Sequence, residues 1–94
     1  MTTETVAHNE QVSRFEMRVQ GQLCIAQYHL IDGVMWITHT EVPPTLQRRG
    51  LAARVVKAAL DHARAHGLKV RPACSYVASY MRRHPETHDL MEAQ

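Results

Sequence analysis

Apolar and polar residues alternate along Phe15–Val19, which is the period of a strand that buries one of its faces. A second apolar segment covers Leu23–Ile31, and the dipeptide Asp32-Gly33 separates it from a third at Val34–Val42. Asp-Gly between two apolar segments is a strong signal for a β-hairpin. Pro43-Pro44 then ends the third strand, because proline has no amide hydrogen to donate to a sheet. The first half of the chain therefore predicts three antiparallel strands.

The second half changes to the period of an α-helix. Apolar residues form one stripe between Leu51 and His66, and Gly67 follows at the C′ position that glycine favours. Leu68–Ala73 predicts a short strand, and Tyr76–His84 predicts a second, shorter helix that Pro85 ends. Strands joined by a helix are usually parallel, through a right-handed crossover. We therefore expect an α/β (α+β) fold, with two helices and a mixed sheet of antiparallel N-terminal strands plus one parallel strand.

The 94 residues are enough for one domain. Residues 1–10 are polar and lack the apolar core of a signal peptide, so we expect a flexible tail there and a single domain over residues 11–94. No apolar run approaches the roughly 20 residues that cross a membrane. The two cysteines have no zinc-type spacing and fit a reducing compartment. These observations predict a cytoplasmic protein with no metal site and no membrane partner.

The charge balance is modest, with a net charge of +2 at pH 7 and only 5% aromatic residues. A nucleic-acid-binding domain usually carries a stronger basic patch or clustered exposed aromatic residues, so we expect no nucleic-acid partner. A small core and an open sheet edge favour weak self-association. We therefore expect a monomer or a weak homodimer.

The segment Gln47–Ala52, with the sequence QRRGLA, connects the proline break to the first helix. The first amides of a helix have no partner within it, and the helix dipole is positive there, so a phosphate binds favourably. The amides of Arg48 to Ala53 would face such an anion, while Gly50 and Ala52 leave the backbone accessible. The same letters also fit a plain basic connection with a helix-packing glycine. With its flanking pattern, the segment predicts a phosphorylated cofactor.

The order of these elements resembles the GNAT N-acetyltransferase superfamily. Gln47–Ala52 matches its [Gln/Arg]-x-x-Gly-x-[Gly/Ala] acetyl-CoA signature, Val42-x-Pro44 matches the lead-in, and Tyr80-x-Arg82 resembles a later motif. More closely, the chain resembles the minimal GNAT-like family, through three features in the expected order. These are His39-Thr40-Glu41-Val42, Cys74 and Arg83-His84-Pro85-Glu86. The likeness covers roughly Phe15 to Leu90.

The resemblance implies a fold that lacks the two helices with which larger members wall the acceptor site. It implies that the pantetheine arm of coenzyme A lies between two splayed strands, here Trp36–Val42 and Leu68–Ala73. The implied function is acetyl-CoA-dependent N-acetylation of an unidentified small-molecule or peptide amine; the alternative is a non-catalytic CoA-binding or acyl-CoA-binding module. The residues expected to bind the cofactor are Thr40, Val42, Gln47, Arg48, Arg49, Gly50, Leu51, Ala52, Ala53 and Arg83.

Cys74 is the first candidate for catalysis. It lies between a predicted strand and the next helix, where the helix N-terminus favours a thiolate. The resemblance places it near the thioester, where the thiolate would either accept the acetyl group or only line the thiol end of CoA. The third interpretation is a small buried hydrophobe. Cys24, inside an apolar strand, is expected in the core.

Three further residues are candidates for moving protons. Glu41 and His39 share one face of a strand end beside the turn, and either is a candidate general base for the amine. Tyr80 matches the tyrosine that protonates the departing CoA thiolate in many family members. The plainer alternatives are solvated polar groups for the first two and a packed helix residue for Tyr80.

Overall fold

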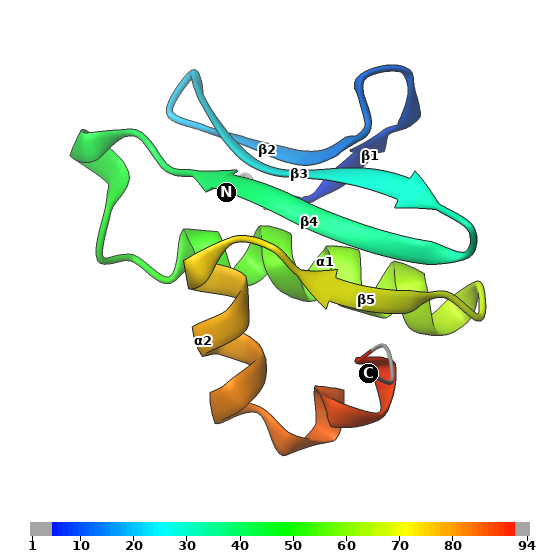
Figure 1. The fold of residues 1–94 in the computed structure, drawn as a ribbon. Helices are drawn as coiled ribbons and strands as arrows, with labels where there is room; N and C mark the ends of the chain where they lie inside the picture. The colour runs from blue at the N-terminus through cyan, green and yellow to red at the C-terminus, as the bar shows by residue number, and fades with distance from the viewer. Residues whose placement is uncertain (1–4, 92–94) are drawn as a thin grey trace.

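The computed structural model describes residues 5–91 and is a five-stranded sheet with its helices packed on one face (Figure 1). The strands follow the sheet order β1-β2-β3-β4-β5, antiparallel except for the parallel pair β4–β5. The elements are β1 (Ala7–Asn9), η1 (Glu10–Val12), β2 (Arg14–Val19), β3 (Gln22–Ile31), β4 (Val34–Glu41), η2 (Pro44–Leu46), α1 (Leu51–Ala65), β5 (Lys69–Pro72), α2 (Ser75–Arg83) and η3 (Pro85–Leu90). The mixed sheet confirms the predicted fold class.

Two tight turns hold the antiparallel strands together. Asp32 and Gly33 have φ values of +50° and +78°, and Gln20 and Gly21 have +53° and +76°. Two consecutive left-handed residues are the mark of the type I′ turn, whose twist matches that of the strands it joins. The predicted Asp-Gly hairpin is therefore present.

A bulge in β4 changes which side chains face the helices. Gln27 of β3 pairs with His39 and Tyr28 pairs with Ile37, so Thr38 is an extra residue without a partner of its own in this register. Such an insertion reverses the alternation of side chains beyond it. As a result, Ile37 and Thr40 both face the helices.

Helix α1 covers the inner face of the sheet with one apolar stripe. Its buried residues are Leu51, Val55, Val56, Ala59, Leu60 and Ala63. The helix ends in a Schellman motif, with the amide of Gly67 donating to Arg64 O (3.4 Å) and that of Leu68 donating to Ala63 O (2.9 Å). Gly67 has φ = +67° and is the predicted C′ residue.

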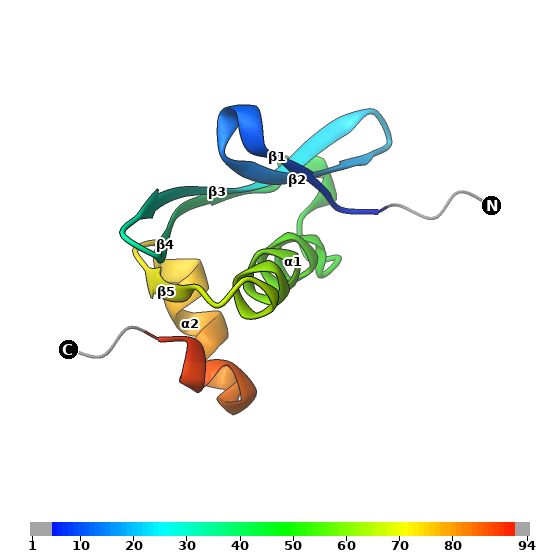
Figure 2. The same ribbon diagram turned by 90° about the vertical axis from the view of Figure 1, so that its right-hand side faces the viewer.

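Helix α2 lies on the same side of the sheet as α1, beneath β5 (Figure 2). Its buried side chains Val77, Tyr80 and Met81 join those of α1 and the sheet in one core. The opposite face of the sheet has no helix over it in the described part of the chain. Within residues 5–91, no helix has the length and apolar character needed to cross a membrane.

The predicted flexible tail over residues 1–10 needs a correction. Residues 1–4 lie outside the described residues, but Ala7–Asn9 forms β1 and pairs with β2. The ring of His8 stacks on Phe15 with centroids 4.2 Å apart, and its Nε2 lies 2.6 Å from the hydroxyl of Tyr28. The segment is therefore ordered by contacts with residues far along the chain, which its own polar sequence does not reveal.

Candidate functional site

The two parallel strands separate at their carboxyl ends. Their register runs from Val34 opposite Lys69 to Ile37 opposite Pro72, and the amide of Ala73 then donates to Ile37 O (3.0 Å). Beyond this point β4 continues to Glu41, whereas the other chain turns into α2. The two chains diverge there, at a place that we call the wedge.

Cys74 and Thr40 meet in this wedge. The hydroxyl oxygen of Thr40 lies 3.6 Å from the sulfur of Cys74, and the bulge at Thr38 is what aims Thr40 inward. Cys74 is also the N-cap residue of α2. The strand end and the helix start therefore bring a hydroxyl and a thiol together, although they are 34 residues apart in the chain.

The surroundings of Cys74 favour its thiolate. Partial burial opposes the charge, but hydrogen bonds from the amide of Val77, the hydroxyl of Thr40 and the amide of Tyr76 outweigh it and lower the pKa of the Cys74 thiol below its ordinary value. These amides belong to the first turn of α2, where the helix dipole also stabilises negative charge. Burial alone raises the pKa of Cys24, which has no solvent exposure. Cys24 therefore lies in the core, as the sequence predicts, and the pKa values of the two thiols are shifted in opposite directions.

The turn before α1 has an unusual backbone. Arg48 and Gly50 both lie in the left-handed region, with φ values of +69° and +74°, and Gly50 is the N-cap of α1. A Cβ added at Gly50 would meet no atom within 4 Å, and the first turn of α1 contains no acidic residue. Open space therefore lies next to the unpaired amides of the helix.

A cavity of about 220 Å³ adjoins this turn. It is lined by Val42, Leu46, Gln47, Arg48, Gly50, Leu51, Ala52 and Tyr76. Six of the residues expected to bind the cofactor are in this set, while Arg49 is exposed beside it. Gln47 donates from Nε2 to Val42 O (3.2 Å), which ties the turn to the end of β4. The structure thus gathers most of the predicted residues around one hollow.

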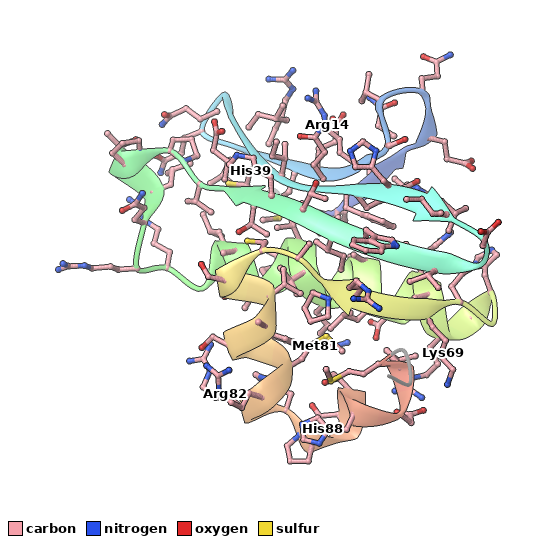
Figure 3. The ribbon with its side chains drawn as sticks, viewed as in Figure 1. Arg14, His39, Lys69, Met81, Arg82 and His88 are labelled. Atoms are coloured by element: carbon pink, nitrogen blue, oxygen red, sulfur yellow. The ribbon has the colours of Figure 1, made fainter. Side chains whose placement is uncertain are left out.

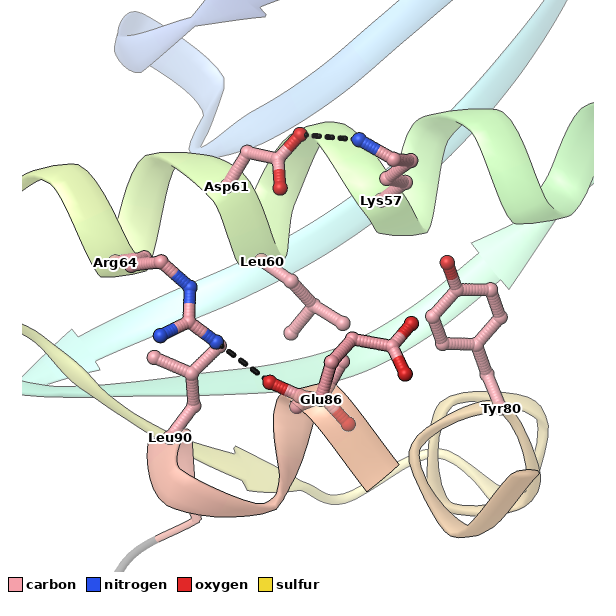
Figure 4. Close-up of a pocket in the computed structure, with 8 residues that line it drawn as sticks. Lys57, Leu60, Asp61, Arg64, Tyr80, Glu86 and Leu90 are labelled. Carbon is pink, nitrogen blue, oxygen red and sulfur yellow. Dashed lines mark hydrogen bonds and ion pairs between the residues drawn. The ribbon is translucent and has the colours of Figure 1, made fainter. Parts of the chain in front are cut away.

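A groove between α1 and α2 continues from this cavity. A volume of about 400 Å³ is lined by Ala53, Arg54, Lys57, Tyr76, Tyr80, Arg83 and His84. Tyr76 lines both hollows, so they adjoin each other. A third volume of about 400 Å³ lies further along, between α1 and η3, and shares Lys57 and Tyr80 with the groove (Figure 4).

Tyr80 lies in the groove, with its ring stacked on that of His84 (centroids 3.9 Å apart). Burial raises the pKa of its hydroxyl above the ordinary value, so the group is protonated at neutral pH. Of the two tyrosines of α2, Tyr76 is the one that lines the cavity at the turn. Sequence reasoning selected Tyr80 by its motif and passed over Tyr76.

His39 and Glu41 lie on the opposite face of the sheet from Thr40, since neighbouring strand residues alternate between faces. Nε2 of His39 is 3.1 Å from Oε1 of Glu41, and their side chains are 53% and 63% exposed. Figure 3 shows His39 beside the carboxyl end of β4. The structure therefore pairs His39 with Glu41, on the face of the sheet opposite to the Cys74 thiol.

Two cationic residues of the groove were also missed. Arg54 and Lys57 are not among the site residues that the sequence predicts, yet both line the groove. Their spacing of three residues places them on one face of α1, with Arg54 about one helical turn and Lys57 about two turns beyond Gly50. That spacing is the signal in the sequence that identifies them.

Within residues 5–91, no three His, Cys, Asp or Glu side chains are arranged to hold a metal ion.

Comparison with known proteins agrees with this geometry. A family model described as GCN5-related N-acetyl-transferase matches residues 14–90. Protein NATD1 of Mus musculus is 31% identical over 83 residues, covering 85% of this chain and 76% of the mouse protein. Protein NATD1 of Homo sapiens is 30% identical over 83 residues, covering 85% of this chain and 74% of the human protein.

A solved structure shares the fold. The solution structure of a GCN5-like protein from Staphylococcus aureus matches with a TM-score of 0.77 and 23% identity, covering 100% of this chain and 93% of that one. These findings confirm the family resemblance seen in the sequence. Because the family model covers most of the residues and the fold agrees, the chain belongs to the GCN5-related N-acetyltransferase family.

Proposed function

We propose that the chain is an acetyl-CoA-dependent N-acetyltransferase that acts on an amine. The observation that supports it most is the cavity at the N-terminus of α1, which adjoins the end of β4. The end of β4 also holds Thr40 against the Cys74 thiol. A nucleotide thioester needs both features, an anion site and a place for its sulfur, within one molecule's reach.

The residues around the turn fit the cofactor. The open space at Gly50 and the absence of acidic residues in the first turn of α1 leave the helix amides accessible to a pyrophosphate. Arg48 and Arg49 add positive charge, and the side chain of Gln47 holds the turn against Val42. Val42 lines the cavity at the turn, and Thr40 lies against Cys74 in the wedge. Acetyl-CoA, when bound, supplies an acetyl group already activated as a thioester.

Four residues in different places divide the chemistry between them. Cys74, with its lowered pKa, supplies a thiolate either as acetyl acceptor or as part of the wall around the thioester. His39 and Glu41 sit on the other face of β4, where an amine approaching from that face would lose its proton to one of them. Tyr80, protonated in the groove, is our candidate donor to the departing thiolate.

One observation favours a second function. In the described part of the chain no helix covers the outer face of the sheet, so a wall for the acceptor is not provided by these residues (Figure 2). A domain of this kind is equally suited to hold CoA or acyl-CoA without turnover. We therefore retain a non-catalytic CoA-binding module as the alternative.

The two functions separate in one experiment. Thermal unfolding is followed with and without CoA, and release of free thiol from acetyl-CoA is then measured with a panel of amines. Both functions predict a higher melting temperature with CoA, because a ligand that binds only the folded state stabilises it. Amine-dependent thiol release identifies the enzyme, and a thermal shift alone identifies the binding module. Absence of both effects at millimolar ligand would overturn the proposal.

A further inference from the structure

We propose that the hollow between α1 and η3 binds a small organic cation, a primary ammonium group that carries a short apolar chain. The hollow has a volume of about 400 Å³, and side chains of α1, α2 and η3 line it (Figure 4). No thioester takes part in this site. It therefore goes beyond the proposed function and can be tested on the chain alone.

A buried hydroxyl without a protein partner is the first observation. Tyr80 is only 6% exposed, and its hydroxyl makes no hydrogen bond within the described residues. Every fully enclosed polar side-chain atom of residues 5–91 has a hydrogen-bond partner, so this hydroxyl oxygen must still reach open space. Figure 4 shows it pointing towards α1, with the carboxylate of Glu86 extending towards the tyrosine ring. Buried tyrosine hydroxyls usually have a partner, so a ligand atom would fill this position.

The charges around the hollow leave one carboxylate without an ion pair. Nζ of Lys57 lies 2.8 Å from Oδ2 of Asp61, and Nη1 of Arg64 lies 2.7 Å from Oδ2 of Asp89. Both cations that line the hollow are thus already paired with a carboxylate. Glu86 also lines the hollow and forms no ion pair within residues 5–91. The excess charge is therefore negative, which favours a cation.

The segment that carries Glu86 is held in place from two sides. Nη2 of Arg64 donates to Glu86 O (2.8 Å) and to Oδ1 of Asp89 (3.0 Å). On the other side, the buried hydroxyl of Thr87 donates to His84 O (2.7 Å). Since these contacts fix the backbone on both sides of the carboxylate, a ligand would find it at a defined position.

The remaining wall of the hollow is apolar. Leu60 and Leu90 line it and are 3% and 5% exposed, so the alkyl chain of a ligand would lie against a packed surface. An ammonium group has three N–H donors and no acceptor, which matches the Glu86 carboxylate and the Tyr80 oxygen. An anion would instead meet the unpaired carboxylate. The hollow therefore selects a different charge from the cationic groove next to it.

NMR titration of the ¹⁵N-labelled chain at pH 7 tests the site with three probes of similar length: n-butylamine, 1-butanol and butyrate. The amine is protonated at this pH, as a lysine side chain is. It should shift the amide signals around Leu60, Thr87 and Leu90, and it should bind about tenfold more tightly than the alcohol, because of its charge-assisted hydrogen bonds. Butyrate should bind more weakly than the alcohol.

Two substitutions assign the contacts. Glu86→Gln should reduce the affinity for the amine about tenfold and leave that for the alcohol unchanged, and Tyr80→Phe should reduce the affinity for the amine about threefold. Glu10→Gln is the matched control, because it removes the same charge at an exposed position of η1. Thermal unfolding checks that each variant is folded.

Four results would overturn the site. These are no saturable binding of the amine, equal affinities for amine and alcohol, a preference for the amine that survives Glu86→Gln, and an equal loss in Glu10→Gln. Amine-induced shifts confined to the neighbourhood of Cys74 would also overturn it, because they would place the amine at the wedge. Stabilisation by CoA is measured separately, so failure of this site leaves the proposed function open to its own test.

Discussion

At the scale of single residues, the two cysteines show how position decides chemistry. Cys24 is enclosed by the core, and burial raises the pKa of its thiol. Cys74 is also partly buried, but the amides of Val77 and Tyr76 and the hydroxyl of Thr40 lower its pKa in net. The difference comes from hydrogen-bond donors, because both thiols lose water on folding.

Replacing Thr40 with valine should therefore make Cys74 less reactive. Loss of the hydroxyl removes one hydrogen bond to the thiolate, so the pKa of Cys74 rises and its alkylation at pH 7 slows by about threefold. The rate of iodoacetamide labelling against pH, followed by mass spectrometry, measures this. Thr40→Ser keeps the hydroxyl and should keep the rate. An unchanged pH profile in Thr40→Val would show that the Thr40 hydroxyl does not lower the pKa of Cys74.

Because the pKa of His62 is lowered in the folded state, we predict that the protein loses stability in mild acid. The centroid of the His62 ring lies 4.4 Å from that of His8 and 4.0 Å from that of His66. Burial lowers the pKa of His62 most, and the charges of His66 and His8 lower it further, while Glu10 raises it. The folded-state pKa is thus below the unfolded value of about 6.5, so the unfolded chain binds the proton first as the pH falls. The stability is complete above about pH 6.5 and declines as the pH drops through the lowered pKa.

Urea denaturation between pH 7.5 and about 5 measures this effect. The midpoint should fall with pH in the wild type, and more gently in His62→Gln, which removes the titrating ring. His29→Gln, at an exposed position of β3, is the control and should keep the wild-type slope. If the midpoint falls as steeply with pH in His62→Gln as in the wild type, His62 is not the group whose protonation lowers the stability. The carboxylates with lowered pKa values, Glu16 and Asp89, contribute to the pH dependence mainly below this range.

At the scale of elements, local geometry explains most of what forms. The two hairpins turn on consecutive left-handed residues, and α1 closes on Gly67 with two Schellman hydrogen bonds. The turn before α1 uses the same device for another purpose. Left-handed Arg48 and Gly50 direct the chain so that the start of α1 faces a cavity instead of the core.

Gly50→Glu should abolish stabilisation by CoA. A carboxylate at the N-cap of α1 would occupy the open space and repel a pyrophosphate, whereas Gly50→Ala introduces the same backbone strain without the charge. Both variants should lose about 1–2 kcal/mol of unfolding free energy from the left-handed conformation. Thermal unfolding with and without CoA distinguishes them: the shift should persist in the alanine variant. An undiminished shift in Gly50→Glu would mean that CoA binds elsewhere.

At the scale of the whole molecule, one core supports both the fold and the turn. Leu46, in η2, has no solvent exposure and joins the cluster formed by the sheet, α1 and α2. It therefore anchors the loop that carries the candidate cofactor turn. Stability and ligand binding should be coupled through this side chain.

Leu46→Ala should lower the free energy of unfolding by about 2–5 kcal/mol, through lost burial and the cavity that remains. It should also weaken CoA binding, because the turn loses its anchor. Urea denaturation and calorimetry measure the two effects. Val12→Ala, at a site 46% exposed, should change stability by about 0.5 kcal/mol or less. If Leu46→Ala loses only about 0.5 kcal/mol of unfolding free energy, the core does not hold this loop.

The sequence alone determined the elements whose signals are local. The alternation in Phe15–Val19, the Asp32-Gly33 turn, the stripe of α1 and its glycine stop each depend on neighbours within a few residues, so pattern and backbone preference suffice. The order of these elements, together with Gln47–Ala52, was also enough to identify the family.

Only the tertiary structure decided the features that depend on distant residues. The strand at Ala7–Asn9 is held by Phe15 and Tyr28, and the bulge at Thr38 depends on the register with β3. Tyr76 lines the cavity at the turn. The adjoining groove is lined by Arg54, Lys57 and Arg83. Both arrangements depend on how α1 and α2 pack against each other. Register and packing are set by the free energy of the whole core, which no local window of sequence contains.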